Sequence, residues 1–191
     1  MNMTSRSSAS APSRLTRLFA AAALAVALAA HGSALALPAE GEKAPNARVE
    51  DADGRQLEMK SLGGKPILIV YEDKDSSAQN QVLKDELAKL ARGDRYKSAI
   101  ALTAVADVSA YNFWPVKGFV KDAIRDESKK AGTTIYCDWD GSFRSRYRLR
   151  EGVSSVVLVG RDGLVLFAAE GALSADRRSE LLKLLRGQVG K

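Results

Sequence analysis

The chain has 191 residues, with 29 Lys plus Arg, 23 Asp plus Glu, one His and one Cys, and a formal net charge of +6. Apolar residues make up 46% of it, which is ordinary for a globular domain and too high for a disordered chain. The single cysteine excludes an internal disulfide framework and a CxxC redox pair, and the single histidine excludes His-rich zinc sites.

The first 36 residues predict a secretory signal peptide. They contain three arginines and no acidic residue, and they include an uninterrupted apolar run from Leu18 to Ala30. This run is too short to cross about 30 Å of hydrocarbon as a helix, and Ala34-Leu35-Ala36 fits the A-x-A cleavage rule. We expect cleavage after Ala36, residues 37–191 as the mature domain, and a periplasmic location with secretion as the alternative. An uncleaved amphipathic helix is the other interpretation of this segment.

Loss of this segment lowers the net charge to +3, because its three arginines leave with it. The remaining charge no longer argues for nucleic acid as a partner. His31 is removed as well, so the mature chain lacks the commonest general base and the commonest metal ligand. We expect no metal, no cofactor and no later segment that spans a membrane.

The mature chain begins with a leader and a predicted β-hairpin. Asp51-Ala52-Asp53-Gly54 lies between two short alternating runs, which is typical of a hairpin turn. Residues 67–71 (ILIVY) are apolar without alternation and predict a central strand covered on both faces. Asp75-Ser76-Ser77 then predicts the N-cap of a helix that ends at Gly93.

The next elements alternate between strand and helix. Residues 100–108 predict a second covered strand, and residues 116–130 predict a helix that ends near Gly132. Residues 133–137 predict a short strand. Residues 142–149 fit either a helix or a strand.

The C-terminal part predicts a strand over 153–159, a hairpin through Arg161-Asp162-Gly163 into 164–169, and a last helix capped by Ser174. This order predicts an α/β fold, a three-layer α/β/α sandwich with a mixed central sheet and an N-terminal β-hairpin. Pairing should be parallel in the first half and antiparallel in the second.

Four stretches of the chain resemble one known superfamily. They are Gly41-Glu42-Lys43-Ala44-Pro45, residues 64–71 (GKPILIVY), residues 136–141 (YCDWDG) and residues 152–171. Together they resemble the exported redoxin branch of the thioredoxin-like superfamily, and within it the YtfJ-type periplasmic family. The resemblance covers residues 41–186 and implies a thioredoxin-like fold.

The sequence departs from this superfamily where its redox members carry out chemistry. Those members place a CxxC motif after the strand that corresponds to residues 67–71. Here Ser76 and Gln79 stand in the positions of the two cysteines, within about a residue, and Ser154 stands in the slot of a cis-proline. A serine hydroxyl has too high a pKa to be activated by a helix N-terminus as a thiol is. The resemblance therefore does not imply oxidoreductase or peroxidase activity, and we expect a non-enzyme rather than an enzyme.

Cys137 is the fallback catalytic residue. It offers an alternative function, a thiol-dependent reductase or peroxidase. A free cysteine at a strand end is more often a buried structural residue, which is the interpretation we favour.

Acidic residues near two turns have two interpretations each. Asp73 and Asp75 beside Ser76 suit either a cation or the cap of a helix, and the pattern favours capping. Residues 138–142 (DWDGS) resemble the opening of a calcium loop, but Leu149 stands where a bidentate Glu is needed. A D-G turn is therefore favoured.

Arg144, Arg146, Arg148 and Arg150 alternate with other residues. In an extended segment they would form a basic edge for weak contact with phosphate, lipid headgroups or an acidic partner, and such an edge would suit a tethered structural or regulatory protein. In a helix they would spread into a solvated surface, which we favour.

Residues 111–115 (YNFWP), called the lip below, place three aromatic side chains after a predicted strand. This is where open α/β sheets usually bind ligands, although the same aromatics also suit folding back over the sheet edge. We expect an exported, redox-inactive binding or assembly module of the cell envelope, whose partner is another envelope protein or peptide. The predicted contact surface consists of Asp73, Asp75, Ser76, Gln79, Tyr111, Phe113, Trp114, Ser154 and Ser155.

Overall fold

The computed structural model describes residues 37–92 and 94–189. The predicted signal peptide lies outside these residues. The elements in chain order are β1 (Arg48–Glu50), β2 (Gln56–Glu58), η1 (Met59–Leu62), β3 (Ile67–Glu72), α2 (Gln81–Ala91), α3 (Asp94–Ala99), β4 (Ala101–Asp107), η2 (Ser109–Tyr111), α4 (Val116–Ala131), β5 (Ile135–Asp138), α5 (Ser142–Tyr147), β6 (Ser155–Val159), β7 (Val165–Glu170) and α6 (Ala175–Val189).

The strands form one mixed sheet with the order β2-β1-β5-β4-β3-β6-β7. The central strands β3, β4 and β5 run parallel, while β6 and β7 are antiparallel neighbours of β3 and of each other. β1 and β2 form the predicted N-terminal hairpin, and β1 joins β5 through a single residue pair, Glu50 with Cys137. The predicted three-layer α/β/α sandwich with a mixed sheet is confirmed.

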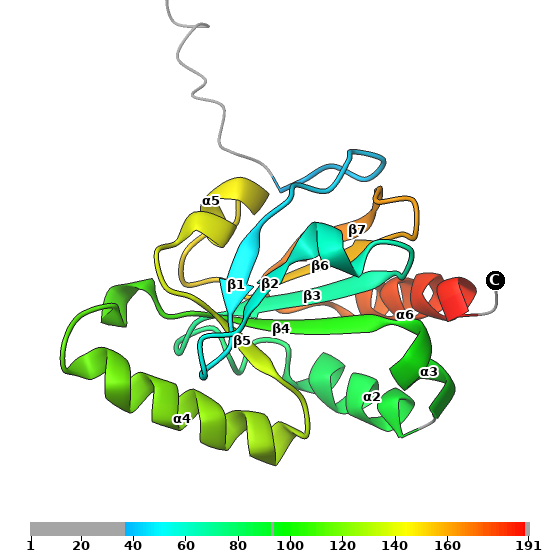
Figure 1. The fold of residues 1–191 in the computed structure, drawn as a ribbon. Coiled ribbons are helices and arrows are strands. Elements are labelled where there is room, and N and C mark those ends of the chain that lie inside the picture. The colour runs from blue at the N-terminus through cyan, green and yellow to red at the C-terminus, as the bar shows by residue number, and fades with distance from the viewer. Residues whose placement is uncertain (1–36, 93, 190–191) are drawn as a thin grey trace, which may run out of the picture. The chain divides into compact units, whose positions relative to one another are not determined.

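The central strand β3 is covered on both faces of the sheet. Its residues 67–71 are all buried, as the unbroken apolar run predicts. On one face α2 and α6 pack over β3 and β6, and α4 packs over the ends of β4 and β5 (Figure 1). The core under α2 and α6 consists of Leu68, Val70, Leu83, Leu87, Val156, Leu158, Phe167, Leu173, Leu181 and Leu185.

The other face is covered by α5, η1 and the N-terminal strands. The ring of Phe143 in α5 stacks on Tyr71 of β3 at 5.6 Å between centroids, and on Tyr147 at 4.5 Å. Such aromatic pairs add stabilisation beyond the area that they bury. These contacts hold α5 against the centre of the sheet.

Most element positions agree with the sequence-based predictions. α4 ends at Ala131, and its C-cap residue Gly132 adopts a left-handed backbone with φ 63° that glycine tolerates without strain. The predicted start of α2 is wrong: the helix begins at Gln81, and residues 74–80 form successive turns after Asp73. The strands predicted from residues 133 and 153 each begin two residues later, at Ile135 and Ser155. The segment 142–149, which was left open, begins with the short helix α5.

Within the described residues, no helix combines the length and apolarity that crossing a membrane requires.

Candidate functional site

Three chain segments meet at the carboxyl edge of the parallel strands. β3, β4 and β5 are adjacent and parallel, so the residues after each of them lie at one edge of the sheet. In open α/β sheets this edge is the usual place for ligands. It carries residues 72–79, called the junction below, together with the lip and the turn after β5.

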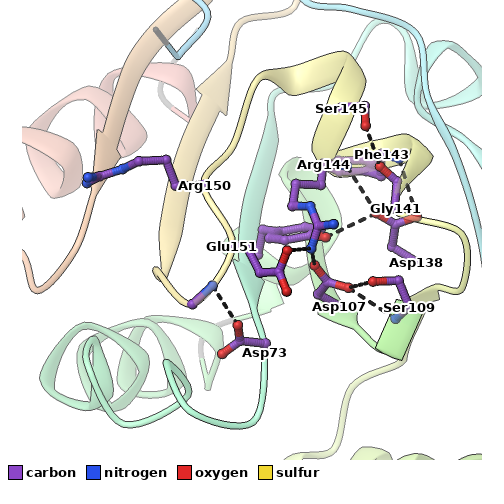
Figure 2. Close-up of polar contacts among 12 residues, drawn as sticks. Asp73, Asp107, Ser109, Asp138, Gly141, Phe143, Arg144, Ser145, Arg150 and Glu151 are labelled. Carbon is purple, nitrogen blue, oxygen red and sulfur yellow. Dashed lines mark hydrogen bonds and ion pairs between the residues drawn. The ribbon is translucent and has the colours of Figure 1, made fainter. Parts of the chain in front are cut away.

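The junction turn is organised by Asp73. Its Oδ1 accepts hydrogen bonds from the backbone N–H of Asp75 and Ser76 and from Ser76 Oγ, at 2.8–3.0 Å. Its Oδ2 accepts one from Gly152 N–H at 2.8 Å (Figure 2). Partial burial favours the neutral acid, but these hydrogen bonds outweigh burial and hold the pKa of Asp73 below its usual value. The expected helix cap is wrong: α2 begins after Asn80, whose side chain makes no capping hydrogen bond, and Asp73 instead organises the turns that precede the helix.

Ser76 and Ser154 are both buried. Ser154 N–H donates to Gln79 Oε1 at 3.1 Å, a hydrogen bond that a proline in this slot could not make. Ser154 Oγ donates to Glu72 Oε1 at 3.0 Å, and Gln79 Nε2 donates to Gly152 O at 3.3 Å. Ser154 and Gln79 therefore join the junction to the start of β6 through direct hydrogen bonds.

Asn80 completes this network, although no sequence pattern singles it out. The side chain is buried and donates to Ser154 Oγ at 2.8 Å and to Gly171 O at 2.9 Å. Its Oδ1 accepts the N–H of Leu173 at 2.9 Å. The junction is thus filled by the protein's own polar groups, whose hydrogen bonds are made internally.

Cys137 lies away from the junction. It is 1% exposed, on β5, in a small core with Val108 and Trp139. Burial, reinforced by the nearby carboxylate of Glu50, raises the pKa of the Cys137 thiol to about 12. The thiolate, which is the reactive form, is therefore scarce at neutral pH.

Two buried aspartates, Asp107 and Asp138, are the last residues of β4 and β5 (Figure 2). Asp107 accepts hydrogen bonds from Ser109 and forms an ion pair with Arg144 of α5, which also contacts Glu151 at 3.2 Å. Charge attraction from Asp107 and Glu151 outweighs partial burial and raises the pKa of Arg144. The ion pair fastens α5 to the carboxyl edge of β4.

The carboxylate of Asp138 caps the first turn of α5. It accepts the backbone N–H groups of Phe143 and Arg144, at 3.3 and 3.0 Å, and the Tyr71 hydroxyl at 3.0 Å. Burial, only partly offset by these hydrogen bonds, raises the pKa of Asp138. Burial also raises the pKa of Tyr71, reinforced by the charge of Asp138. The residues 138–142 form a helix-capping turn, as favoured over a calcium loop.

The lip is exposed at its tip. Trp114 is 91% exposed and Phe113 is 55% exposed, whereas Tyr111 packs partly against Val108. Phe119, one helical turn later in α4, is also exposed. The alternative in which all the lip aromatics fold back over the sheet therefore holds for Tyr111 alone.

The structure brings only part of the predicted contact surface together. Asp73, Ser76, Gln79 and Ser154 are linked by hydrogen bonds, whereas Asp75 is exposed and Ser155 is buried with its hydroxyl directed to Val153 O. Among residues 37–92 and 94–189, no hydrogen bond or ring contact joins the lip to the junction.

The four arginines do not form a common basic edge. Residues 142–147 are helical, and three of the arginines form ion pairs with carboxylates: Arg144 with Asp107 and Glu151, Arg148 with Glu42, and Arg150 with Glu170. The acidic cluster that binds Arg144 was not predicted. One signal was available, because an aspartate ends each of two neighbouring parallel strands, at Asp107 and Asp138.

The comparisons with known proteins identify a family and a fold. The family model described as "Bacterial protein of unknown function (YtfJ_HI0045)" matches residues 48–188. The chain belongs to the YtfJ family. A search of the curated proteins finds no match.

Solved structures similar to this YtfJ-family protein share its fold. A protein assigned as the thiol:disulfide interchange protein DsbE of Chlorobium tepidum has a TM-score of 0.60 and 16% identity, over 80% of this chain and 99% of that one. The thiol peroxidase of Chromobacterium violaceum has a TM-score of 0.55 and 16% identity, over 80% and 88%. The exposed lipoprotein thioredoxin of Streptococcus pneumoniae has a TM-score of 0.55 and 16% identity, over 74% and 98%. These likenesses show a thioredoxin-like fold.

Proposed function

We propose that this YtfJ-family protein is an exported, redox-inactive thioredoxin-like protein that acts as a binding or assembly module in the cell envelope. The proposal rests on the junction, which contains no thiol and whose buried polar side chains are hydrogen-bonded within the protein. Ser76 and Gln79 stand where redox relatives have cysteines, and both are hydrogen-bonded within the protein. The chain's one cysteine is buried on another strand. A fold retained without an accessible thiol favours recognition over electron transfer.

The lip is the part of the predicted surface that is best suited to contact a partner. Trp114 and Phe113 expose large rings at the sheet edge where α/β folds bind ligands. Exposed aromatic side chains of this kind are frequent anchors of protein interfaces. The partner in this proposal is another envelope protein or a peptide.

Two observations support an envelope location. The first 36 residues have the pattern of a secretory signal, and two of the similar structures are a DsbE protein and an exposed lipoprotein thioredoxin. Periplasmic retention is the form we favour, and secretion is the alternative.

The redox part of the proposal is tested with insulin-reduction and peroxide-consumption assays on the purified protein. We expect no turnover above buffer, for the wild type and for Cys137→Ser alike, because the buried thiol is protonated at neutral pH. Turnover comparable to that of a CxxC protein, abolished in Cys137→Ser, would instead establish the alternative reductase or peroxidase function.

The binding part is tested by cross-linking and co-purification from envelopes. We compare the wild type with Trp114→Ala and Phe113→Ala, and we use Val82→Ala as the matched control, since Val82 is a 54% exposed apolar residue of α2. We expect a specific partner to be lost with the lip variants and retained with Val82→Ala and Cys137→Ser. An identical partner set for all variants would remove the lip from the proposal.

A further inference from the structure

Three exposed aromatic side chains lie where the lip runs into α4. Trp114 is 91% exposed, Phe119 is 72% exposed and Phe113 is 55% exposed. The backbone N–H of Lys117 donates to Phe113 O at 2.9 Å, so the lip leads directly into the first turn of the helix. This end of α4 lies at the edge of the domain away from α6 (Figure 1). The three side chains are called the aromatic patch below.

The helix positions of two of these rings make their exposure unusual. Pro115 is the N-cap of α4, so Trp114 precedes the cap and Phe119 is the fourth residue of the helix. Apolar side chains at these two positions commonly pack against each other and fix the entry of the chain into a helix. Here both rings stay largely exposed. Their apolar surface is therefore open to another molecule.

The aromatic patch is the one cluster of exposed large apolar side chains among residues 37–92 and 94–189. The others are Val82, Leu102 and Leu164, which lie apart on α2, on β4 and in the turn before β7. Single exposed apolar residues are ordinary on protein surfaces, whereas a cluster marks a contact surface. The patch is therefore also the apolar surface that a second copy of this chain offers.

The charges beside the patch are mostly paired within the chain. In the first two turns of α4, Lys121 forms an ion pair with Glu50 at 3.6 Å, and Asp122 forms one with Arg125 at 2.6 Å. Lys117 is the remaining charge, and its ammonium group donates to a neutral amide of the lip at 2.9 Å. The surroundings therefore do not select a charged partner. Repulsion between two identical patches is limited to Lys117.

The area of the patch suits a weak dimer. An aromatic side chain buries roughly 150–250 Å², so three rings with these exposures present roughly 400 Å² on each chain. Two facing patches would bury roughly 800 Å² of ring surface, whereas stable specific interfaces bury about 1,200–2,000 Å² in total. The rings thus supply most of a small interface that forms and dissociates readily.

We propose that the aromatic patch is a self-association surface, at which two copies of this protein pair about a two-fold axis. Identical chains most often pair with this symmetry, which places the same patch of each copy against the other. Offset-stacked or edge-to-face rings then fill the contact. The inference rests on the proposed function in that both use the lip, and it names a second copy as the partner.

Sedimentation velocity of the purified protein tests the pairing. We expect the average mass to rise from monomer toward dimer between about 10 μM and about 1 mM, as a small interface implies. Trp114→Ser and Phe119→Ser should each raise the dimer dissociation constant about tenfold or more, because each removes one of the three rings. Val82→Ser is the matched control, since Val82 is 54% exposed and lies on α2. All three side chains are exposed, so the variants should keep the fold, which circular dichroism verifies.

Opposite charges at position 119 show whether the two patches face each other. Phe119→Glu and Phe119→Lys should each be monomeric, because like charges then lie close across the interface. A mixture of the two should form a heterodimer, because unlike charges then meet. If the patch instead contacted a different surface of the second copy, mixing the variants would restore no pairing.

Three results would each overturn this inference: a monomer at about 1 mM, a dissociation constant unchanged in both serine variants, or assemblies that grow beyond the dimer. Failure of the mixed variants to pair would do the same. These outcomes are separate from the proposed function, which the envelope co-purification tests. A lip-dependent envelope partner of a protein that stays monomeric would leave the proposed function standing and remove only the self-association.

Discussion

At the scale of single residues, one carboxylate determines the conformation of the junction. Asp73 accepts hydrogen bonds from Asp75, Ser76 and Gly152, so it connects the turn after β3 to the segment before β6. Asp75, two residues later, is exposed and receives no hydrogen bond at its carboxylate among the described residues. These two aspartates offer a matched comparison of the same side chain in two environments.

We expect Asp73→Asn to lower the free energy of unfolding by about 1–2 kcal/mol at pH 7, since it weakens several hydrogen bonds to a charged acceptor. The pKa of Asp73 is lower in the folded state than its ordinary value of 3.8. Its stabilising contribution is therefore fully present above that value and is lost as the pH falls through the folded-state pKa. The penalty should shrink below about pH 4 in urea unfolding experiments. Asp75→Asn should stay within about 0.5 kcal/mol, and an equal penalty for both variants would contradict this account.

At the scale of elements, α5 depends on contacts outside itself. A helix of six residues is too short to be stable alone. It is held by the side-chain carboxylate of Asp138, which accepts two backbone N–H groups of the helix, by the stack of Phe143 on Tyr71, and by the ion pair of Arg144 with the buried Asp107. The ion pair is the contact that connects α5 to β4.

Arg144→Ala should lower the free energy of unfolding by about 2–3 kcal/mol, because it leaves the carboxylate of Asp107 buried without its cation. Arg146→Ala is the control in the same helix, since Arg146 makes no ion pair with any described residue. We expect less than about 0.5 kcal/mol for it. Chemical unfolding at neutral pH measures both, and similar losses would show that the pair with Asp107 does not anchor α5.

The helix α4 is the least firmly packed of the long helices. It has no fully buried residue, whereas α2 buries Leu83 and Leu87, and α6 buries Leu181 and Leu185. We expect hydrogen exchange of α4 amides to require an opening free energy about 2 kcal/mol lower than that of α6 amides. Mass spectrometry of peptides from residues 116–131 and 175–189 measures this difference. Equal protection of the two helices would mean that α4 opens only with the whole domain.

At the scale of the whole molecule, the fold was largely predictable because its signals are local. The unbroken apolar run 67–71 indicated a doubly covered strand, and the D-G pairs indicated the hairpin turns. The start of α2 was mistaken because a serine-aspartate cluster can cap a turn as well as a helix. The segment 142–149 stayed open because only its tertiary contacts make its first residues helical.

The candidate site was less predictable because its bonds are long-range. Asn80 bonds to residues 74, 91 and 93 positions away in the sequence, so no local pattern identifies it. The lip was identifiable because three aromatics precede a proline, yet only the structure distinguishes exposed Trp114 from half-buried Tyr111. The exposure of a side chain and its hydrogen-bond partners depend on the assembled fold, so sequence patterns alone do not predict them.

The described domain is held by its apolar cores without internal disulfides, because the chain has one cysteine. We expect the urea midpoint of unfolding to be the same with and without reductant, in contrast to proteins whose CxxC pair changes redox state. An oxidant such as diamide should form no disulfide between two native chains, because Cys137 is buried, and should cross-link two chains only after unfolding. Non-reducing gels of native and urea-treated samples distinguish these cases. Rapid oxidation of the native protein would mean that β5 opens under native conditions and exposes Cys137, and the proposal that the protein is redox-inactive would then fail.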